Sequence, residues 1–149
     1  MINQIHSLLS AFTTWTGLSM NYSIHGFVRF IRENGLSLSQ ISTLFQLYHC
    51  GTSAVSQISS NLDISNAAVS QLLERLVQQG LITRSENPLD RREKKLVLTN
   101  KGYELLRDSA KACSAWQEQL VSTLTPEEQN KVSEALEILI EKTKQLPDA

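Results

Sequence analysis

The chain of 149 residues has few of the residues that define specialised protein classes: two cysteines, three prolines, six glycines and a net charge of only −1. Cys50 and Cys113 lie far apart and have no C-x-x-C spacing, so they neither require a disulfide framework nor form a metal knuckle. No repeat or low-complexity segment is present. With 41% hydrophobic and 19% charged residues, the composition indicates an ordinary globular protein that can bury a real core.

Long uninterrupted apolar runs are also missing. The segment Met1–Tyr22 has no basic start, and serine, threonine, asparagine and glutamine interrupt its apolar residues, so it reads neither as a signal peptide nor as a membrane span. We therefore expect a cytoplasmic protein that does not associate with a membrane.

The usual catalytic motifs are absent. There is no G-x-S-x-G, no H-E-x-x-H and no P-loop, and no two glycines are close enough for a dinucleotide-binding turn. The three histidines His6, His25 and His49 are scattered singly. We expect that the chain is not an enzyme and uses no cofactor or metal. A metal site made of His49, Cys50 and Cys113 stays open as an alternative.

Charge is unevenly distributed, although its sum is small. The segment Arg75–Lys111 holds nine basic and five acidic residues, whereas Glu118–Asp148 holds seven acidic residues and three lysines. The first segment therefore suits a polyanion and the second does not, although a charge run is also compatible with a simple solvated face.

Apolar spacing predicts mostly helices. Three- and four-residue steps indicate a long helix over Ile2–Arg32, in which Gly17 and Gly26 favour a bend or break. Capping boxes at Ser37–Gln40 and Thr125–Glu128 mark two further helix starts. The other expected elements are helices over 37–51, 54–61, 65–80, 99–124 and from 125 onward, and strands over 81–84 and 95–98.

Two short helices joined by a tight turn and followed at once by a β-hairpin form the order of a winged helix-turn-helix. The fold class expected here is therefore mainly α with a small β-hairpin wing. Burial of the apolar stripe of helix 65–80 leaves a small, mostly uncharged face outside, made of Asn66, Ala67, Ser70, Gln71 and Glu74.

That outer face has the chemistry of a helix that enters a major groove. Ala67 can approach a thymine methyl, and Asn66, Ser70 and Gln71 can exchange hydrogen bonds with base edges. Glu74 fits less well, because it would either accept from a cytosine amine or hold Arg75. An ordinary solvated face remains the alternative reading of the same pattern.

The hairpin loop, Asn87–Lys95, is rich in basic residues. Beside a recognition helix such a loop can reach an adjacent minor groove, where the negative potential of a narrow A·T tract attracts arginine. In this picture Asp90 would not touch DNA and would instead orient Arg92 through a carboxylate–guanidinium pair. A solvated turn is the alternative.

The run Leu62–Gly102 closely resembles the multiple antibiotic resistance regulator (MarR) family, whose wing carries D-x-R followed by an L-T-x-x-G strand-to-helix junction. The positions are filled by Asp90, Arg92, Leu98, Thr99 and Gly102. Ser59 and Asp63 depart from the alanine and glycine that are common in the family, although aspartate tolerates a left-handed turn. Neither departure affects the expected fold.

The resemblance implies a homodimer that binds pseudo-palindromic double-stranded operators, commonly as a repressor. It divides the chain into an N-terminal dimerisation helix over 1–34, a winged helix-turn-helix over 35–100 and C-terminal dimerisation helices over 101–149. By position it also implies that Arg92 is the wing-tip residue that enters the minor groove. The residues expected at the DNA are Ser65, Asn66, Ala67, Ala68, Ser70, Gln71, Arg75, Arg84, Asp90, Arg91, Arg92 and Lys94.

The resemblance also implies an effector pocket between the dimerisation and DNA-binding parts, suited to a phenolic or other aromatic compound. Its candidate lining residues are Trp15, Met20, Tyr22, His25, Tyr48 and His49. Redox sensing through Cys50 or Cys113 is a second route, but Cys50 ends a predicted helix, where the dipole disfavours a thiolate. A winged helix that serves only as a protein-interaction module is a further alternative.

Overall fold

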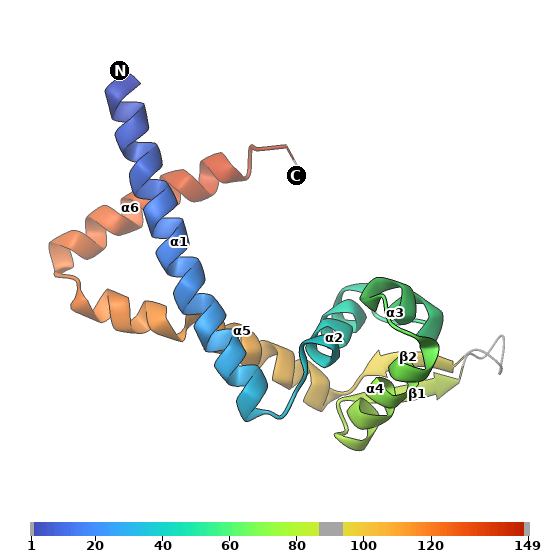
Figure 1. The fold of residues 1–149 in the computed structure, drawn as a ribbon. Coiled ribbons are helices and arrows are strands. Elements are labelled where there is room, and N and C mark those ends of the chain that lie inside the picture. The colour runs from blue at the N-terminus through green and yellow to red at the C-terminus, as the bar shows by residue number, and fades with distance from the viewer. Residues whose placement is uncertain (1, 87–93, 148–149) are drawn as a thin grey trace. The chain divides into compact units, whose positions relative to one another are not determined.

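The computed structural model describes residues 2–86 and 94–147. The elements follow one another as α1 (Ile2–Glu33), α2 (Leu38–Cys50), α3 (Val55–Leu62), α4 (Asn66–Gln78), β1 (Ile82–Glu86), β2 (Lys94–Leu98), α5 (Asn100–Thr123) and α6 (Pro126–Thr143) (Figure 1). This is the expected winged helix-turn-helix between long helices. The chain forms two compact units, residues 1–113 and 114–149, whose boundary falls inside α5.

The hydrogen bonds of both predicted capping boxes are present in the structure. The Ser37 hydroxyl accepts from the backbone N–H of Gln40, and the Gln40 side chain accepts from the Ser37 N–H at 2.8 Å, so the box at the start of α2 is complete. Thr125 and Glu128 form the same reciprocal pair at the start of α6, with Pro126 in the first turn.

The long first helix is not broken at its glycines, contrary to the bend expected there. α1 runs through Gly17 and Gly26 as one helix. Gly26 instead marks a close approach, because a Cβ at this position would overlap the carbonyl oxygen of Ala112 in α5. The C-terminal end of α1 also packs on the core through Phe27 and Ile31.

The turn between α3 and α4 explains the two departures from the family pattern. Asp63 takes up the left-handed conformation with φ 51°, which aspartate tolerates better than most residues. The Ser59 hydroxyl donates to the carbonyl of Ile64 at 2.7 Å, and the Ser59 carbonyl accepts from the Asp63 N–H. Ser59 therefore stabilises the turn that sets the angle between α3 and α4.

β1 and β2 form an antiparallel hairpin in which Ile82 pairs with Leu98 and Glu86 pairs with Lys94. Ser53, before α3, adds an isolated bridge to Leu96 on the other edge of β2. Ile82, Leu96 and Leu98 are buried, so one face of the hairpin closes the core. Figure 1 shows the hairpin next to α4, and contacts join α4 to β1.

The core lies within the winged helix, where α2, α3, α4, the hairpin and the first half of α5 meet. Its fully buried side chains include Ile41, Leu44, Leu47, Ile58, Val69, Leu73, Leu76, Ile82 and Leu96. α1 and α6, in contrast, carry large apolar side chains that are exposed in the single chain. None of the helices in the part of the chain that the structure describes could span a lipid bilayer.

Candidate nucleic-acid interface

α4 places its apolar and polar residues on opposite sides, as its sequence predicts. Val69, Leu72, Leu73 and Leu76 are buried against the core. The opposite side is exposed and contains Asn66, Ala67, Ala68, Ser70, Gln71, Glu74 and Arg75. The helix therefore presents small and amide side chains to the outside over its first half, and the charged Glu74 and Arg75 follow them.

The N-terminal turn of α4 is held by its own polar side chains. The exposed Ser65 is the N-cap, and its hydroxyl accepts from the Ala68 N–H at 3.3 Å. The Ser70 hydroxyl donates to the Asn66 carbonyl at 2.9 Å, which leaves the Ser70 oxygen as an acceptor. Cytosine and adenine present amine donors in the major groove that such an acceptor suits.

Glu74 has a partner that was not expected from the sequence, which suggested either a cytosine amine or Arg75. Its carboxylate accepts a hydrogen bond from the Arg84 guanidinium of β1 at 3.2 Å, and both side chains are about half exposed. This pair links the recognition helix to the base of the wing. Arg84 therefore lies at the predicted interface, but with its charge already paired.

The wing tip falls outside the described residues, and with it Asp90, Arg91 and Arg92. Lys94 is placed by its backbone, which opens β2 opposite Glu86. The hairpin stem thus connects α4 to the segment of the chain that contains Arg91 and Arg92.

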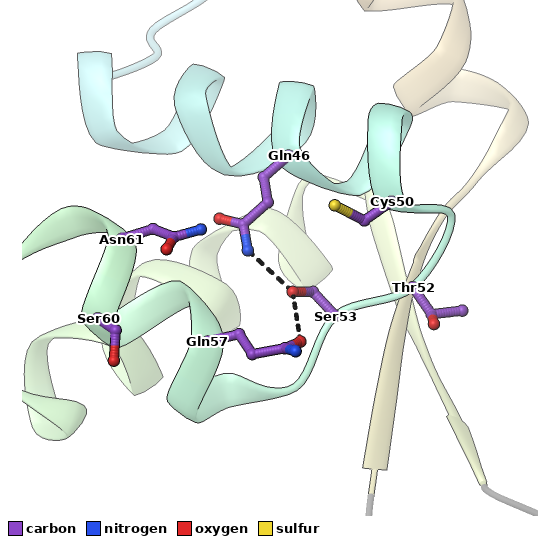
Figure 2. A pocket seen from close by; sticks show the side chains of 7 residues that line it. All are labelled: Gln46, Cys50, Thr52, Ser53, Gln57, Ser60 and Asn61. Atoms are coloured by element: carbon purple, nitrogen blue, oxygen red, sulfur yellow. Dashed lines mark hydrogen bonds between the residues drawn. The ribbon is translucent and has the colours of Figure 1, made fainter.

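A polar cavity of about 400 Å³ lies between α2 and α3 (Figure 2). Gln46 donates to the buried Ser53 hydroxyl at 2.9 Å, and Ser53 donates to the Gln57 amide oxygen at 3.2 Å. The same oxygen accepts from the Ala54 N–H, so Gln57 caps α3 in place of an N-cap side chain. This network was not expected from the sequence, in which its one local signal is the glutamine three residues after Ala54.

The two thiols lie in different surroundings. Cys50 is exposed and lines the polar cavity, as Figure 2 shows. Cys113 is partly covered, and burial raises the pKa of its thiol. No group of three histidine, cysteine, aspartate or glutamate side chains in residues 2–86 and 94–147 is arranged to hold a metal ion.

A second cavity, of about 470 Å³, lies between α2 and α5 and has aromatic walls. Its lining residues are Phe45, Tyr48, Tyr103, Glu104, Leu106, Arg107 and Ala110. The rings of Tyr48 and Tyr103 meet edge to face with centroids 6.0 Å apart. We call this cavity the aromatic pocket.

The aromatic pocket contains only one of the six residues proposed from the sequence, Tyr48. Trp15, Met20, Tyr22 and His25 lie exposed along α1, and His49 is exposed at the end of α2 with its ring against Tyr48. Phe45, Tyr103 and Arg107, which also line the pocket, were not among the residues proposed from the sequence. Residues 103 and 107 are one helical turn apart, and this spacing indicates that they lie on the same face of the helix.

Comparison with known proteins gives a consistent result. The model of the MarR family matches residues 36–94. The HTH-type transcriptional regulator MhqR of Bacillus subtilis is 29% identical over 106 residues, covering 71% of this chain and 73% of MhqR. The HTH-type transcriptional repressor MdtR of the same organism is 31% identical over 98 residues, covering 66% of this chain and 63% of MdtR.

Solved structures share the fold. The transcriptional regulator Tm0710 of Thermotoga maritima matches with a TM-score of 0.72 and 23% identity over 94% of this chain and 96% of its own. The S. aureus MepR–DNA complex matches with a TM-score of 0.58 and 23% identity over 90% of this chain and 98% of that one. The order of the elements, the D-x-R and L-T-x-x-G positions and these relatives together support the assignment of this chain to the MarR family of transcriptional regulators.

Proposed function

We propose that this regulator binds pseudo-palindromic operators as a homodimer and acts as a repressor that an aromatic small molecule releases from DNA. The observation that carries the proposal is the exposed face of α4 beside the hairpin, which is uncharged from Asn66 to Gln71. In the solved S. aureus relative the same fold is bound to DNA, and MdtR is named as a repressor.

The outer face of α4 has the size and chemistry for a major groove. Its residues near the N-terminus are short, so the backbone can approach the base edges, while Asn66 and Gln71 reach further with amide groups. The first-turn N–H groups and the helix dipole favour a phosphate at the N-terminus. Basic residues on the neighbouring hairpin segment would add phosphate and minor-groove contacts.

Dimerisation is proposed from the apolar side chains that the single chain leaves uncovered. On α1 these include Ile5, Leu8, Leu9, Phe12 and Leu18, all more than 45% exposed. An apolar stripe of this length is typical of a protein interface rather than of a solvated surface. Two copies would present two α4 helices to half-sites about one helical turn apart.

The aromatic pocket is the proposed effector site. Its walls of Phe45, Tyr48 and Tyr103 suit a planar ring, and Glu104 and Arg107 also line it, so a polar substituent on the ring would find a partner. The pocket lies between α2, which belongs to the winged helix, and α5. A ligand there contacts both elements and can favour one arrangement of them over another.

The DNA part of the proposal is tested by selecting duplexes from a random pool with the intact protein. Affinity for the selected duplex is then compared with that for a shuffled duplex at one fixed salt concentration. We expect at least about a hundredfold preference, since specific sites usually exceed non-specific DNA by more than that. Equal affinity for the two duplexes would refute sequence-specific binding and would favour a winged helix that serves only as a protein-interaction module.

The wing is tested by Arg92→Ala. We expect operator binding to weaken by about 1 to 3 kcal/mol if Arg92 contacts bases, and by less if it touches phosphate alone. Unchanged affinity at moderate salt would remove the wing tip from the mechanism.

The effector part is tested by adding substituted phenols and benzoates to the complex with the selected duplex, with hydrogen peroxide as a separate arm. We expect release by at least one aromatic compound, abolished by Tyr103→Ala, which keeps DNA binding. Release by peroxide that is lost in a Cys50→Ser, Cys113→Ser double variant would assign the control to redox state instead.

A further inference from the structure

The C-terminal end of α4 closes in a Schellman turn that leaves three carbonyl groups for outside partners. Gly80 has φ +69°, its N–H donates to the Val77 carbonyl at 2.8 Å, and the Leu81 N–H donates to the Leu76 carbonyl at 2.9 Å. The carbonyls of Gln79, Gly80 and Leu81 lie beyond the hydrogen bonds of the helix itself.

All three carbonyls accept from the start of α5. The Thr99 hydroxyl lies 2.7 Å from the Gly80 oxygen and 3.1 Å from the Leu81 oxygen, which also accepts from the Thr99 N–H at 3.1 Å. The Lys101 ammonium donates to the Gln79 carbonyl at 2.9 Å. A cation there also complements the negative end of the α4 dipole.

Thr99 is at the same time the N-cap of α5. Its hydroxyl oxygen accepts from the Gly102 N–H at 3.1 Å, while its single proton points to the α4 carbonyls. Gly102 fits because any Cβ at this position would overlap the Leu81 carbonyl oxygen. One hydroxyl therefore serves both helices, and the glycine lets their ends touch.

We propose that Thr99 is a positioning residue for sequence reading: its hydroxyl fixes the end of α4 to the first turn of α5, so that the recognition helix keeps the tilt its base contacts need. The inference rests on the proposed function of α4. We name this contact the α4–α5 junction, made of Gln79, Gly80, Leu81, Thr99, Lys101 and Gly102.

The junction matters because base recognition depends on narrow hydrogen-bond geometry, whereas phosphate attraction does not. α4 has only 13 residues, so a change of tilt at its end moves the side chains along its length. α5 also carries Tyr103, directly after Gly102, in the wall of the aromatic pocket. The helix that lines the pocket is therefore the helix that holds α4.

The test compares the full-length wild type with Thr99→Val, which has nearly the same shape without the hydroxyl, and with Thr99→Ser, which keeps it. The measured quantity is the specificity ratio, the affinity for the selected duplex divided by that for a shuffled duplex. A loss of folded protein lowers both affinities equally and leaves the ratio unchanged. A misplaced α4 lowers only the affinity for the selected duplex.

We expect Thr99→Val to lower the specificity ratio about tenfold, the size of one good base contact, and Thr99→Ser to restore it. A wild-type-like ratio in Thr99→Val would overturn the positioning role, as would an equal loss in Thr99→Ser. A ratio near one in the wild type would instead refute the proposed function.

If Thr99→Val does not fold, Lys101→Met gives a milder form of the same test. Lys101 is exposed, and its substitution removes only one hydrogen bond of the junction. Its matched control is Lys111→Met, which removes an equal charge from the same helix at a lysine that pairs with Asp108. The specificity ratio should fall a few fold in Lys101→Met alone. Equal ratios in the two lysine variants would overturn the proposal.

Discussion

Arg84 in β1 donates a hydrogen bond to the carboxylate of Glu74 in α4 at 3.2 Å, which joins the base of the wing to the recognition helix. The pair is about half exposed, so it contributes at most about 1 kcal/mol to folding. Its larger consequence is electrostatic. In the proposed complex with DNA, this carboxylate would neutralise an arginine that lies near the phosphates.

Glu74→Gln should therefore strengthen non-specific DNA binding and make it more dependent on salt. The released Arg84 can contact a phosphate, which adds about one unit to the slope of log affinity against log salt concentration. Fluorescence anisotropy with a shuffled duplex over a salt series measures this slope. Glu33→Gln, which removes the same charge from the Arg29 pair on α1, is the control. Equal slopes in both variants would contradict the role assigned to the pair.

Gln71→Ala should lower affinity for the selected duplex by about 1 to 3 kcal/mol and leave affinity for a shuffled duplex nearly unchanged, because an amide pair reads a base and not the backbone. Gln78→Ala is the matched control. It replaces the same residue type, also exposed, two turns nearer the end of α4. Equal effects of the two substitutions would argue against the N-terminal half of α4 as the reading surface.

Much of the fold was predictable because the signals are local. The capping boxes, the buried stripe of α4 and the left-handed Asp63 each depend on residues within one or two turns. The strands extend to Glu86 and begin again at Lys94, slightly beyond the expected bounds, since backbone pairing continues where side-chain alternation stops. The lack of catalytic motifs also agrees with the similarity of this chain to transcriptional regulators.

The aromatic pocket and the Arg84–Glu74 pair were not predictable in the same way. Tyr48 and Tyr103 meet only because α5 returns across α2, and no pattern near either tyrosine reports that crossing. The aromatic residues of α1 were equally good candidates by sequence, yet the helix extends away from the core over most of its length.

Gly26→Ala should destabilise the fold by about 1 to 3 kcal/mol, because the added methyl group overlaps the Ala112 carbonyl and must push α1 from α5. Gly17→Ala provides the control. Nothing lies within 4 Å of a Cβ there, and alanine improves helix propensity by up to about 1 kcal/mol. Urea unfolding at one protein concentration measures both, and similar midpoints would contradict the close contact.

The Cys113 thiol should react slowly with iodoacetamide near neutral pH. Burial raises its pKa, so the thiolate fraction at a given pH is lower than in the unfolded chain. A Cys50→Ser variant isolates this thiol, and its labelling rate is followed by mass spectrometry from pH 7 to pH 10, with and without urea. The native rate profile should lie at higher pH. A native profile at or below that of the unfolded chain would contradict the effect of burial.

The proposed function requires that the outer face of α4 reads base edges from the major groove. Replacing single purines of the selected duplex with 7-deazapurines removes one major-groove acceptor at a time and leaves the pairing and the minor groove intact. We expect affinity to fall about tenfold or more at a few positions in each half-site, and we expect Gln71→Ala to abolish the effect at one of them. Undiminished affinity at every substituted position would refute base reading by α4 in the major groove.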